Sequence, residues 1–262
     1  MKSIIKKWYE KLGFPKEWDS AFFELLEKTE LSPCSPAEYG SSVDFGKNLL
    51  MYLYFCENLQ EKYIKKGIAE KYLLDTLGDI VIWAKTHYGI HKSLGLSETS
   101  WLIRHVTMKL IKLGRLQFCM APAEHGTPDG EISGGENVLE IHICEGEKLD
   151  VDECRKSIDA AKVFFAKYFP EFEYKYFTCH SWLLDSTLST LLGENSNILK
   201  FQKLFEVVSE DASNRIIRYI FRWDMTEEKL ADAVCTSSFA EKVKNHVLSG
   251  NTFHESLGII KK

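Results

Sequence analysis

Two polar residues in a short apolar segment carry side chains that can move protons. Glu140 and His142 stand two residues apart in the run 138–144, where apolar residues alternate with them. The alternation predicts a β-strand that presents the carboxylate and the imidazole on one face. Both groups suit general-base catalysis, and partial burial would raise the pKa of Glu140 towards neutrality. The alternative is a strand whose polar face meets solvent or covers a helix.

A second pair of candidate groups lies in the run 174–182, which also reads as a strand. Cys179 and His180 are neighbours there, so their side chains must point to opposite faces. The imidazole of His180 suits acid–base chemistry or substrate contact, and it equally suits a core position bonded to the backbone. A nucleophilic Cys179 would need a histidine and an orienting acid beside it, so the sequence favours a buried thiol.

The histidines and cysteines do not predict a metal site. The chain has eight histidines, and the only pair with a ligand-like spacing is His87 and His91, on either side of Gly89. Its seven cysteines include no Cys-x-x-Cys pair. We therefore predict no bound metal, and reduced thiols typical of a cytoplasmic protein.

The elements that must position these groups begin with a helical half. Apolar residues recur at helical spacing in four segments, and Pro33, Gly67, Gly89 and Gly114 follow them as breaks. The predicted helices span residues 17–30, 45–65, 69–88 and 97–113, the last with Ser97 as N-cap.

The second half reads as strands alternating with helices. Strands are expected at 115–120, 138–144, 174–182, 205–209 and 215–223; helices at 150–169, 187–192 and 197–204, with two more capped by Thr226 and Ser237. A strand, a crossover helix and another strand imply a parallel or mixed sheet covered by helices. The predicted class is α/β (α+β), with a helical domain at 1–113 and a mixed-sheet domain at 114–262.

Composition excludes several classes of function. Of the 262 residues, 45% are hydrophobic and 27% are charged, as in a globular protein. Residues 1–115 carry 17 Lys+Arg and 14 Asp+Glu, a net +3, and the remainder carries 16 and 24, a net −8. Neither half has the concentrated basic face of a nucleic-acid binder. The most apolar stretch, 49–55, is too short to span a membrane, and the N-terminus lacks the apolar core of a signal peptide.

One alternative interpretation is that the helical half binds DNA. The predicted helix at 97–113, followed by a strand and a hairpin, has a winged-helix layout with Arg104, His105 and Lys109 as contacts. The acidic second half argues against it.

Four segments carry a resemblance to a known family. They are Leu-Gly-Arg-Leu-Gln-Phe (113–118), Leu-Glu-Ile-His-Ile (139–143), Cys-His-Ser-Trp-Leu-Leu-Asp (179–185) and Ser-Asn-Ile-Leu-Lys-Phe-Gln (196–202). Together they resemble a bacterial acyltransferase-like family in which a helical N-terminal domain precedes a GNAT-like C-terminal domain. The resemblance covers roughly residues 40–223 and implies acyl transfer from acyl-CoA or another CoA thioester to a small-molecule or peptide amine. It does not indicate an oligomeric state.

The resemblance also implies a layout for the site. Backbone groups of the central strand, at Ile141 and Ile143, would bond the pantetheine arm, and the following turn with Gly146 and Lys148 would lie near the phosphates. Glu140 or His142 would be the base and His180 an acid or base.

The start of a later helix adds two more cofactor candidates. Ser196 and Asn197 would contact the pantetheine or the leaving sulfur, although Ser196 also fits a simple N-cap.

The loop after the central strand departs from the family pattern. The usual Arg/Gln-x-x-Gly-x-Gly/Ala motif is absent, and residues 145–153 hold five carboxylates against Lys148. Asp150 and Glu153 predict a capping box that would use the helix amides needed for pyrophosphate. This loop supports the alternative of a catalytically inactive binding module for a peptide, an amine or an acyl carrier.

Overall fold

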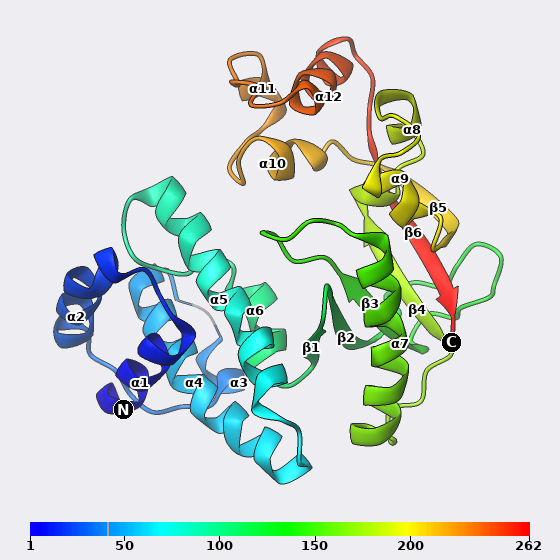
Figure 1. The fold of residues 1–262 in the computed structure, drawn as a ribbon. Coiled ribbons are helices and arrows are strands. Elements are labelled where there is room, and N and C mark those ends of the chain that lie inside the picture. Colours follow the sequence, from blue (N-terminus) through cyan, green and yellow to red (C-terminus); the bar gives the residue numbers. More distant parts are fainter. Residues whose placement is uncertain (41) are drawn as a thin grey trace. The chain divides into compact units, whose positions relative to one another are not determined.

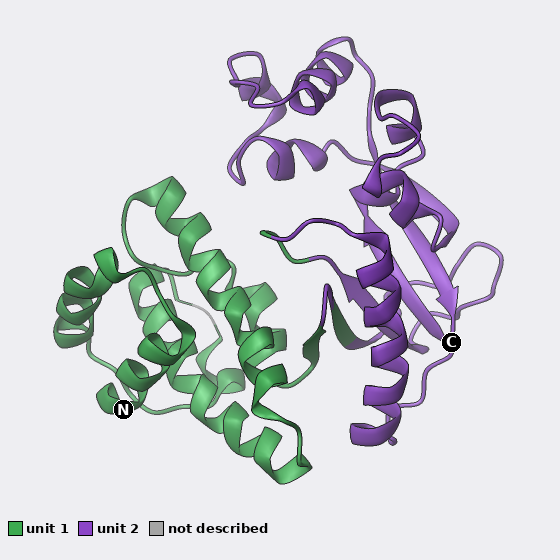
Figure 2. Ribbon diagram, viewed as in Figure 1, with its two compact units in different colours: residues 1–113, 117–119, 144–146 green, residues 114–116, 120–143, 147–262 purple. Residues whose placement is uncertain are grey.

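The chain folds as a helical half followed by a sheet flanked by helices (Figure 1). The computed structural model describes residues 1–40 and 42–262, which divide into two compact units (Figure 2). Unit 1 comprises residues 1–113, 117–119 and 144–146, and unit 2 comprises residues 114–116, 120–143 and 147–262. The predicted fold class is confirmed.

Unit 1 is built from helices that share a core of large side chains. Its elements are α1 (Lys2–Leu12), η1 (Lys16–Trp18), α2 (Asp19–Lys28), α3 (Pro36–Tyr39), α4 (Phe45–Lys66), α5 (Glu70–His91), α6 (Thr99–Val106) and β1 (Leu110–Leu113). Helix α4 begins where the Asp44 carboxylate accepts the Lys47 amide at 2.9 Å, and it ends at Gly67, whose φ of 66° is left-handed. Its apolar face buries Tyr52 and Phe55 almost completely.

The helix predicted at 97–113 is wrong in its second half. Helix α6 stops at Val106, and Met108 takes a left-handed φ of 65° that interrupts helical geometry. The apolar residues beyond it form the strand β1, whose Lys112 amide donates to Oγ1 of Thr76 at 2.9 Å. Ser97 is not the N-cap, because Glu98 holds that position.

One of the contacts proposed for a winged helix, His105, is not accessible to DNA, whereas Lys109 is exposed. His105 is fully buried, and its Nε2 lies 2.9 Å from Oδ2 of Asp79, which also accepts the indole N–H of Trp101 at 2.9 Å. A base-reading side chain must reach a groove, so this histidine cannot serve.

The six strands form one mixed sheet in the order β1-β2-β3-β4-β6-β5. The strands after β1 are β2 (Leu116–Pro122), β3 (Asn137–His142), β4 (Tyr176–Ser181), β5 (Glu206–Ala212) and β6 (His254–Lys261). β3 and β4 are parallel, whereas β4 with β6 and β5 with β6 are antiparallel.

The helices of unit 2 form two groups: one long helix lies over β3 and β4, and shorter helices gather beyond the end of β4 (Figure 1). They are α7 (Val151–Tyr168), η2 (Trp182–Leu184), α8 (Leu188–Leu191), α9 (Asn197–Gln202), α10 (Ile216–Ile220), α11 (Glu227–Leu230) and α12 (Ser238–Leu248). Helix α7 lies over one face of the two parallel strands. On the other face Ile132, from the connection between β2 and β3, packs with Val138, Tyr176 and Ile259.

One prediction for the end of the chain is wrong, and one strand there was not predicted. Residues 216–220 form the helix α10, because Ile216 and Ile217 pack into a helical core cluster with Leu188 and Val243. The last residues, which show no period, form β6 and pair with both β4 and β5. Ser237 caps α12 as predicted, accepting the Ala240 amide at 3.1 Å.

Within residues 1–40 and 42–262, no helix combines the length and apolar character needed to cross a membrane.

Candidate active site

Strand β3 holds the predicted proton-transfer pair on one face of the sheet. Nε2 of His142 lies 3.2 Å from Oε2 of Glu140, and the side chains are 28% and 29% exposed respectively. When Nε2 carries the ring proton, it donates to the carboxylate and the imidazole is held in a defined orientation. The two residues therefore form a partly open acid–base pair.

The neighbouring strand β4 pairs with β3 in parallel only as far as Glu140. The last residues in parallel register are Glu140 and Thr178, yet β3 continues to His142 and β4 continues to Ser181. Over that extension β4 pairs with β6 on its other side. Glu140 is thus the last residue of β3 that is paired with β4, and Ile141 directly follows it.

The residues proposed to bind a pantetheine arm follow that point. Ile141 turns its side chain into the core, where it is almost fully buried, and Ile143 is half-buried just after the strand. Contacts to a cofactor from these residues would come from their peptide groups.

His180 lies on the same face of the sheet as the Glu140–His142 pair. Thr178 is directly opposite Glu140, and side chains two residues apart on a strand share a face. His142 and His180 are each two residues beyond that matched pair. His180 is exposed, which rules out the alternative of a core histidine. One carboxylate and two imidazoles thus occupy this face at the carboxyl ends of β3 and β4.

Cys179 points to the opposite face and is chemically inert. It is almost fully buried, and burial raises the pKa of its thiol to about 12. At neutral pH the sulfur stays protonated, whereas nucleophilic attack needs the thiolate.

Arg115 anchors the loop between β3 and α7, a role that sequence reasoning missed. Its guanidinium donates to two successive carbonyl oxygens, from Nη2 to Glu147 at 2.9 Å and from Nε to Lys148 at 2.8 Å. Its backbone amide donates to Oγ of Ser157 on α7 at 2.8 Å. Arg115 is 6% exposed, and a charged residue inside the apolar run 110–118 is the sequence signal that could have revealed it.

The residue before Arg115 lets the chain approach α7 this closely. Gly114 has a left-handed φ of 67°, and a Cβ there would come within 2.8 Å of Oγ of Ser157. Glycine therefore allows both the turn and the contact.

The two anchored carbonyls determine where the loop amides point. In a trans peptide the C=O of one residue and the N–H of the next face opposite ways. The amides of Lys148 and Leu149 therefore point away from Arg115, and the described residues offer neither of them an acceptor. Successive backbone amides without an acceptor are groups that can bind an anion.

The first turn of α7 is capped, but by half of the predicted capping box. Oδ1 of Asp150 accepts the amides of Asp152 and Glu153 at 2.9 and 3.1 Å. The reciprocal bond from Glu153 is not formed, because the Asp150 amide donates to Lys148 O at 3.0 Å.

The acidic charge of this segment is partly neutralised within α7. Arg155 Nη1 lies 2.8 Å from Asp152, and Lys156 Nζ lies 2.7 Å from Glu153. The carboxylates of Glu145 and Asp150 are in none of the ion pairs of the described residues. Gly146 in the same turn has a left-handed φ of 94°, and the Lys148 side chain is exposed.

Ser196 and Asn197 lie elsewhere, at the start of α9. The Ser196 hydroxyl accepts the Ile198 amide at 3.2 Å, so the simple N-cap is confirmed, and Asn197 is exposed. No hydrogen bond within the described part of the chain joins either residue to the Glu140–His142 pair.

Among the described residues, no group of three or more His, Cys, Asp or Glu side chains could hold a metal ion. The His87 and His91 rings stack with centroids 4.3 Å apart, and Nδ1 of His87 lies 2.6 Å from Oγ of Ser97. Burial lowers the pKa of His87 to about 4.

Comparison with known proteins assigns both halves of the chain. Residues 10–108 match the model of an N-acyltransferase N-terminal domain, and residues 110–260 match that of a GNAT-like C-terminal domain. The comparison with curated proteins gives no match.

Solved acyltransferase structures share the fold. One, in complex with decanoyl-CoA, is 24% identical with a TM-score of 0.77, covering 98% of this chain and 86% of that one. Another, in complex with decanoyl-CoA and teicoplanin, is 20% identical with a TM-score of 0.77, covering 98% and 87%. A mutant in complex with octanoyl-CoA gives the same values as the latter.

Proposed function

We propose that this chain, which belongs to the family that joins an N-acyltransferase N-terminal domain to a GNAT-like C-terminal domain, transfers an acyl group from acyl-CoA to an amine. The observation that carries the proposal is the end of the β3–β4 register beside the Glu140–His142 pair. The similar acyltransferases in complex with decanoyl-CoA and octanoyl-CoA support the acyl donor. The acceptor is a small-molecule or peptide amine.

The pantetheine arm lies where the two parallel strands leave register. An extended arm with two amide groups needs backbone partners of the kind that a neighbouring strand would supply. The peptide groups of Ile141 and Ile143, past the last β3–β4 pair, are placed to take that role. The thioester then lies next to the side chains of Glu140 and His142.

The pyrophosphate binds at the loop amides rather than at the first turn of α7. Asp150 already occupies the amides of residues 152 and 153, whereas those of Lys148 and Leu149 are free. Arg115 fixes their direction through the two carbonyls behind them and adds one positive charge. This arrangement offers a phosphate site despite the missing glycine-rich motif.

The proposed reaction removes one proton from the amine and adds one proton to the leaving sulfur. The Glu140–His142 pair takes one proton from the amine, and the nitrogen lone pair attacks the thioester carbonyl carbon. The tetrahedral intermediate collapses as the C–S bond breaks, which leaves an amide and the CoA thiolate. His180, on the same face beyond the last paired residues of β3 and β4, gives one proton to the sulfur, and water carries the proton of the Glu140–His142 pair back to His180.

A second candidate is a catalytically inactive module that binds a peptide, an amine or an acyl carrier. The capped α7 and the carboxylates of Glu145 and Glu147 favour it, because they oppose a phosphorylated ligand. An acidic rim would instead attract a cationic amine.

Calorimetry followed by turnover separates the two candidates. The full chain at near-millimolar concentration is titrated with decanoyl-CoA, then mixed with a panel of primary amines and short peptides while free CoA thiol and acylated products are measured. Binding together with amine-dependent thiol release supports the transferase. Binding without any product supports the inactive module, and the absence of both binding and a thermal shift rejects the CoA-dependent proposal.

A further inference from the structure

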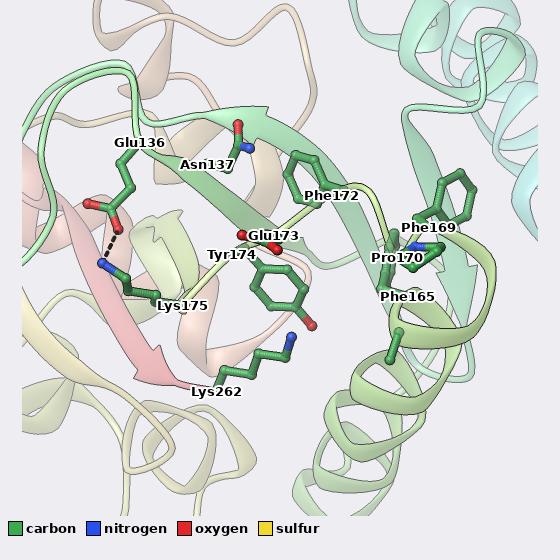
Figure 3. Close-up of a pocket in the computed structure, with 11 residues that line it drawn as sticks. Glu136, Asn137, Phe165, Phe169, Pro170, Phe172, Glu173, Tyr174, Lys175 and Lys262 are labelled. Carbon is green, nitrogen blue, oxygen red and sulfur yellow. Dashed lines mark ion pairs between the residues drawn. The ribbon is translucent and has the colours of Figure 1, made fainter.

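A pocket of about 590 Å³ opens at the end of the sheet opposite to the candidate active site (Figure 3). Asn137 starts β3 and Lys175 precedes β4, whereas His142 and His180 are at the carboxyl ends of those strands. The carboxyl end of α7 and the residue after β6, Lys262, complete the walls. The volume is within the range of small-molecule sites.

One buried polar group in this pocket has no partner. Tyr174 is 7% exposed, and its hydroxyl forms no hydrogen bond with the described residues. Burial raises the pKa of this phenol to about 12, so at neutral pH it keeps its proton. A buried hydroxyl without a partner costs free energy, and a ligand that supplies an acceptor recovers it.

A positively charged group lies close to the Tyr174 ring. Nζ of Lys262 lies 4.3 Å from the centroid of the Tyr174 ring, and the Lys262 amide donates to Lys175 O at 2.9 Å, which fixes its position. The side chain of Lys175 is paired with Glu136 at 3.4 Å. Glu173 is the remaining carboxylate of the lining, on the exposed rim.

The walls beside these donors are aromatic. Phe165 and Phe169 come from the end of α7 and are almost fully buried, and Phe172 packs against Tyr174 with ring centroids 6.0 Å apart at 30°. Apolar rings with an O–H donor and an ammonium suit a ligand with an apolar body and one anionic group.

We infer that this pocket binds a monocarboxylate with an apolar body, whose carboxylate accepts from the Tyr174 hydroxyl and pairs with Lys262. An aromatic and an aliphatic acid share this chemistry, so the two are compared directly. The site is separate from the proposed acyl-CoA site and does not depend on it.

The experiment titrates the full chain, already saturated with decanoyl-CoA, with 3-phenylpropionate, octanoate, octanol and octylamine by calorimetry. Saturation keeps the probes out of the proposed acyl site; if decanoyl-CoA does not bind, the same titrations are made on the free chain. We expect both acids to bind in the millimolar range, and octanol and octylamine to bind at least about tenfold more weakly, since charged hydrogen bonds are the stronger ones. The acid that binds more tightly shows whether the aromatic rings of the pocket prefer an aromatic or an aliphatic ligand.

Matched variants locate the binding. Tyr174→Phe removes only the hydroxyl, and it should weaken acid binding about tenfold. Lys262→Met should weaken it similarly, whereas Glu173→Gln should strengthen it by removing a repelling charge. Tyr63→Phe, which removes another buried tyrosine hydroxyl in α4, is the control and should leave binding unchanged.

Two results would overturn the inference. One is the absence of binding by either acid at 10 mM, a concentration about tenfold above a millimolar Kd. The other is binding that Tyr174→Phe and Tyr63→Phe affect equally, or that octanol matches.

Discussion

The loop anchor at Arg115 gives the sharpest prediction for the acyl-CoA site. Replacing it by methionine keeps an apolar stem in the core and removes the guanidinium. Two charge-assisted hydrogen bonds, at 2.8 and 2.9 Å, would be lost from the carbonyls of Lys148 and Glu147. The peptide planes of the loop would then rotate freely, and the amides of Lys148 and Leu149 would no longer be held outward. We expect Arg115→Met to weaken CoA binding.

The size of the effect follows from these two bonds. A hydrogen bond to a charged group contributes about 1.5–3 kcal/mol, so the two are worth at most about 3–6 kcal/mol. Residues 147 and 148 are exposed, so water can replace the guanidinium on the released carbonyls and roughly half of that value is recovered. A loss of about 1.5–3 kcal/mol in binding corresponds to a Kd increase of roughly 10–150-fold.

A matched control removes the same charge without touching the loop. Arg155→Met also deletes a guanidinium near the start of α7, but its side chain is 55% exposed and pairs only with Asp152 in the ion pairs of the described residues. Exposed pairs contribute about 0–1 kcal/mol, so its Kd should rise less than about fivefold. Calorimetric titration with CoA measures both, and circular dichroism verifies folding. Equal losses in the two folded variants, or no loss in Arg115→Met, would refute the anchoring argument.

Three further outcomes are expected. Glu140→Gln and His142→Gln should each lower kcat about 10²–10⁴-fold with little change in CoA affinity. The double variant should lower kcat no more than the worse single variant, because the two residues act as a unit. Additive losses below tenfold would show that neither residue takes part in the reaction. The lowered pKa of His87 means that the folded state disfavours its protonation, so stability is complete above about pH 6.5 and falls between about 6.5 and 4, by at most about 3 kcal/mol. The difference between wild type and His87→Gln in urea unfolding across that range isolates this contribution from the carboxylates, and parallel curves would contradict it. Cys179→Ala should keep kcat within about twofold, since a thiol with its pKa raised to about 12 is no nucleophile.

The sequence predicts the long elements well where local signals mark both ends. Helix α4 lies within one residue of its expected range because Asp44 caps it and Gly67 ends it. Strand β3 shows its alternation because Leu139 and Ile141 face the core while Glu140 and His142 do not.

The elements that were missed have patterns distorted by close packing. In β6 the inward position 258 is a glycine, because a Cβ there would come within 2.7 Å of Leu184 and 2.8 Å of Phe205. The buried Ser256 further hides the alternation, so the strand shows no period. In α10 the β-branched Ile216 and Ile217 favour a strand locally, and the helical core cluster overrides them.

In the candidate site, too, the sequence predicts one part and misses another. The pairing of Glu140 with His142 follows from a spacing of two on one strand, so the sequence is enough to propose it. The role of Arg115 depends on its contact with carbonyls more than thirty positions away, between Nε and Lys148 O at a sequence separation of 33. No local pattern encodes such a contact.

The cap at Asp150 separates two ways in which the acidic loop could act. Its carboxylate holds the amides of Asp152 and Glu153, and Asp150→Ala would free both while removing one negative charge beside the proposed phosphate site. The variant should lose about 0.5–2 kcal/mol of stability, as for other N-caps, and should bind CoA about three- to tenfold more tightly. Ser237→Ala deletes the cap of α12 and serves as the control, with a similar stability loss and no change in Kd. If Asp150→Ala folds and binds CoA more weakly, the capped turn itself organises the phosphate site, and the assignment of the pyrophosphate to the amides of Lys148 and Leu149 alone must be abandoned.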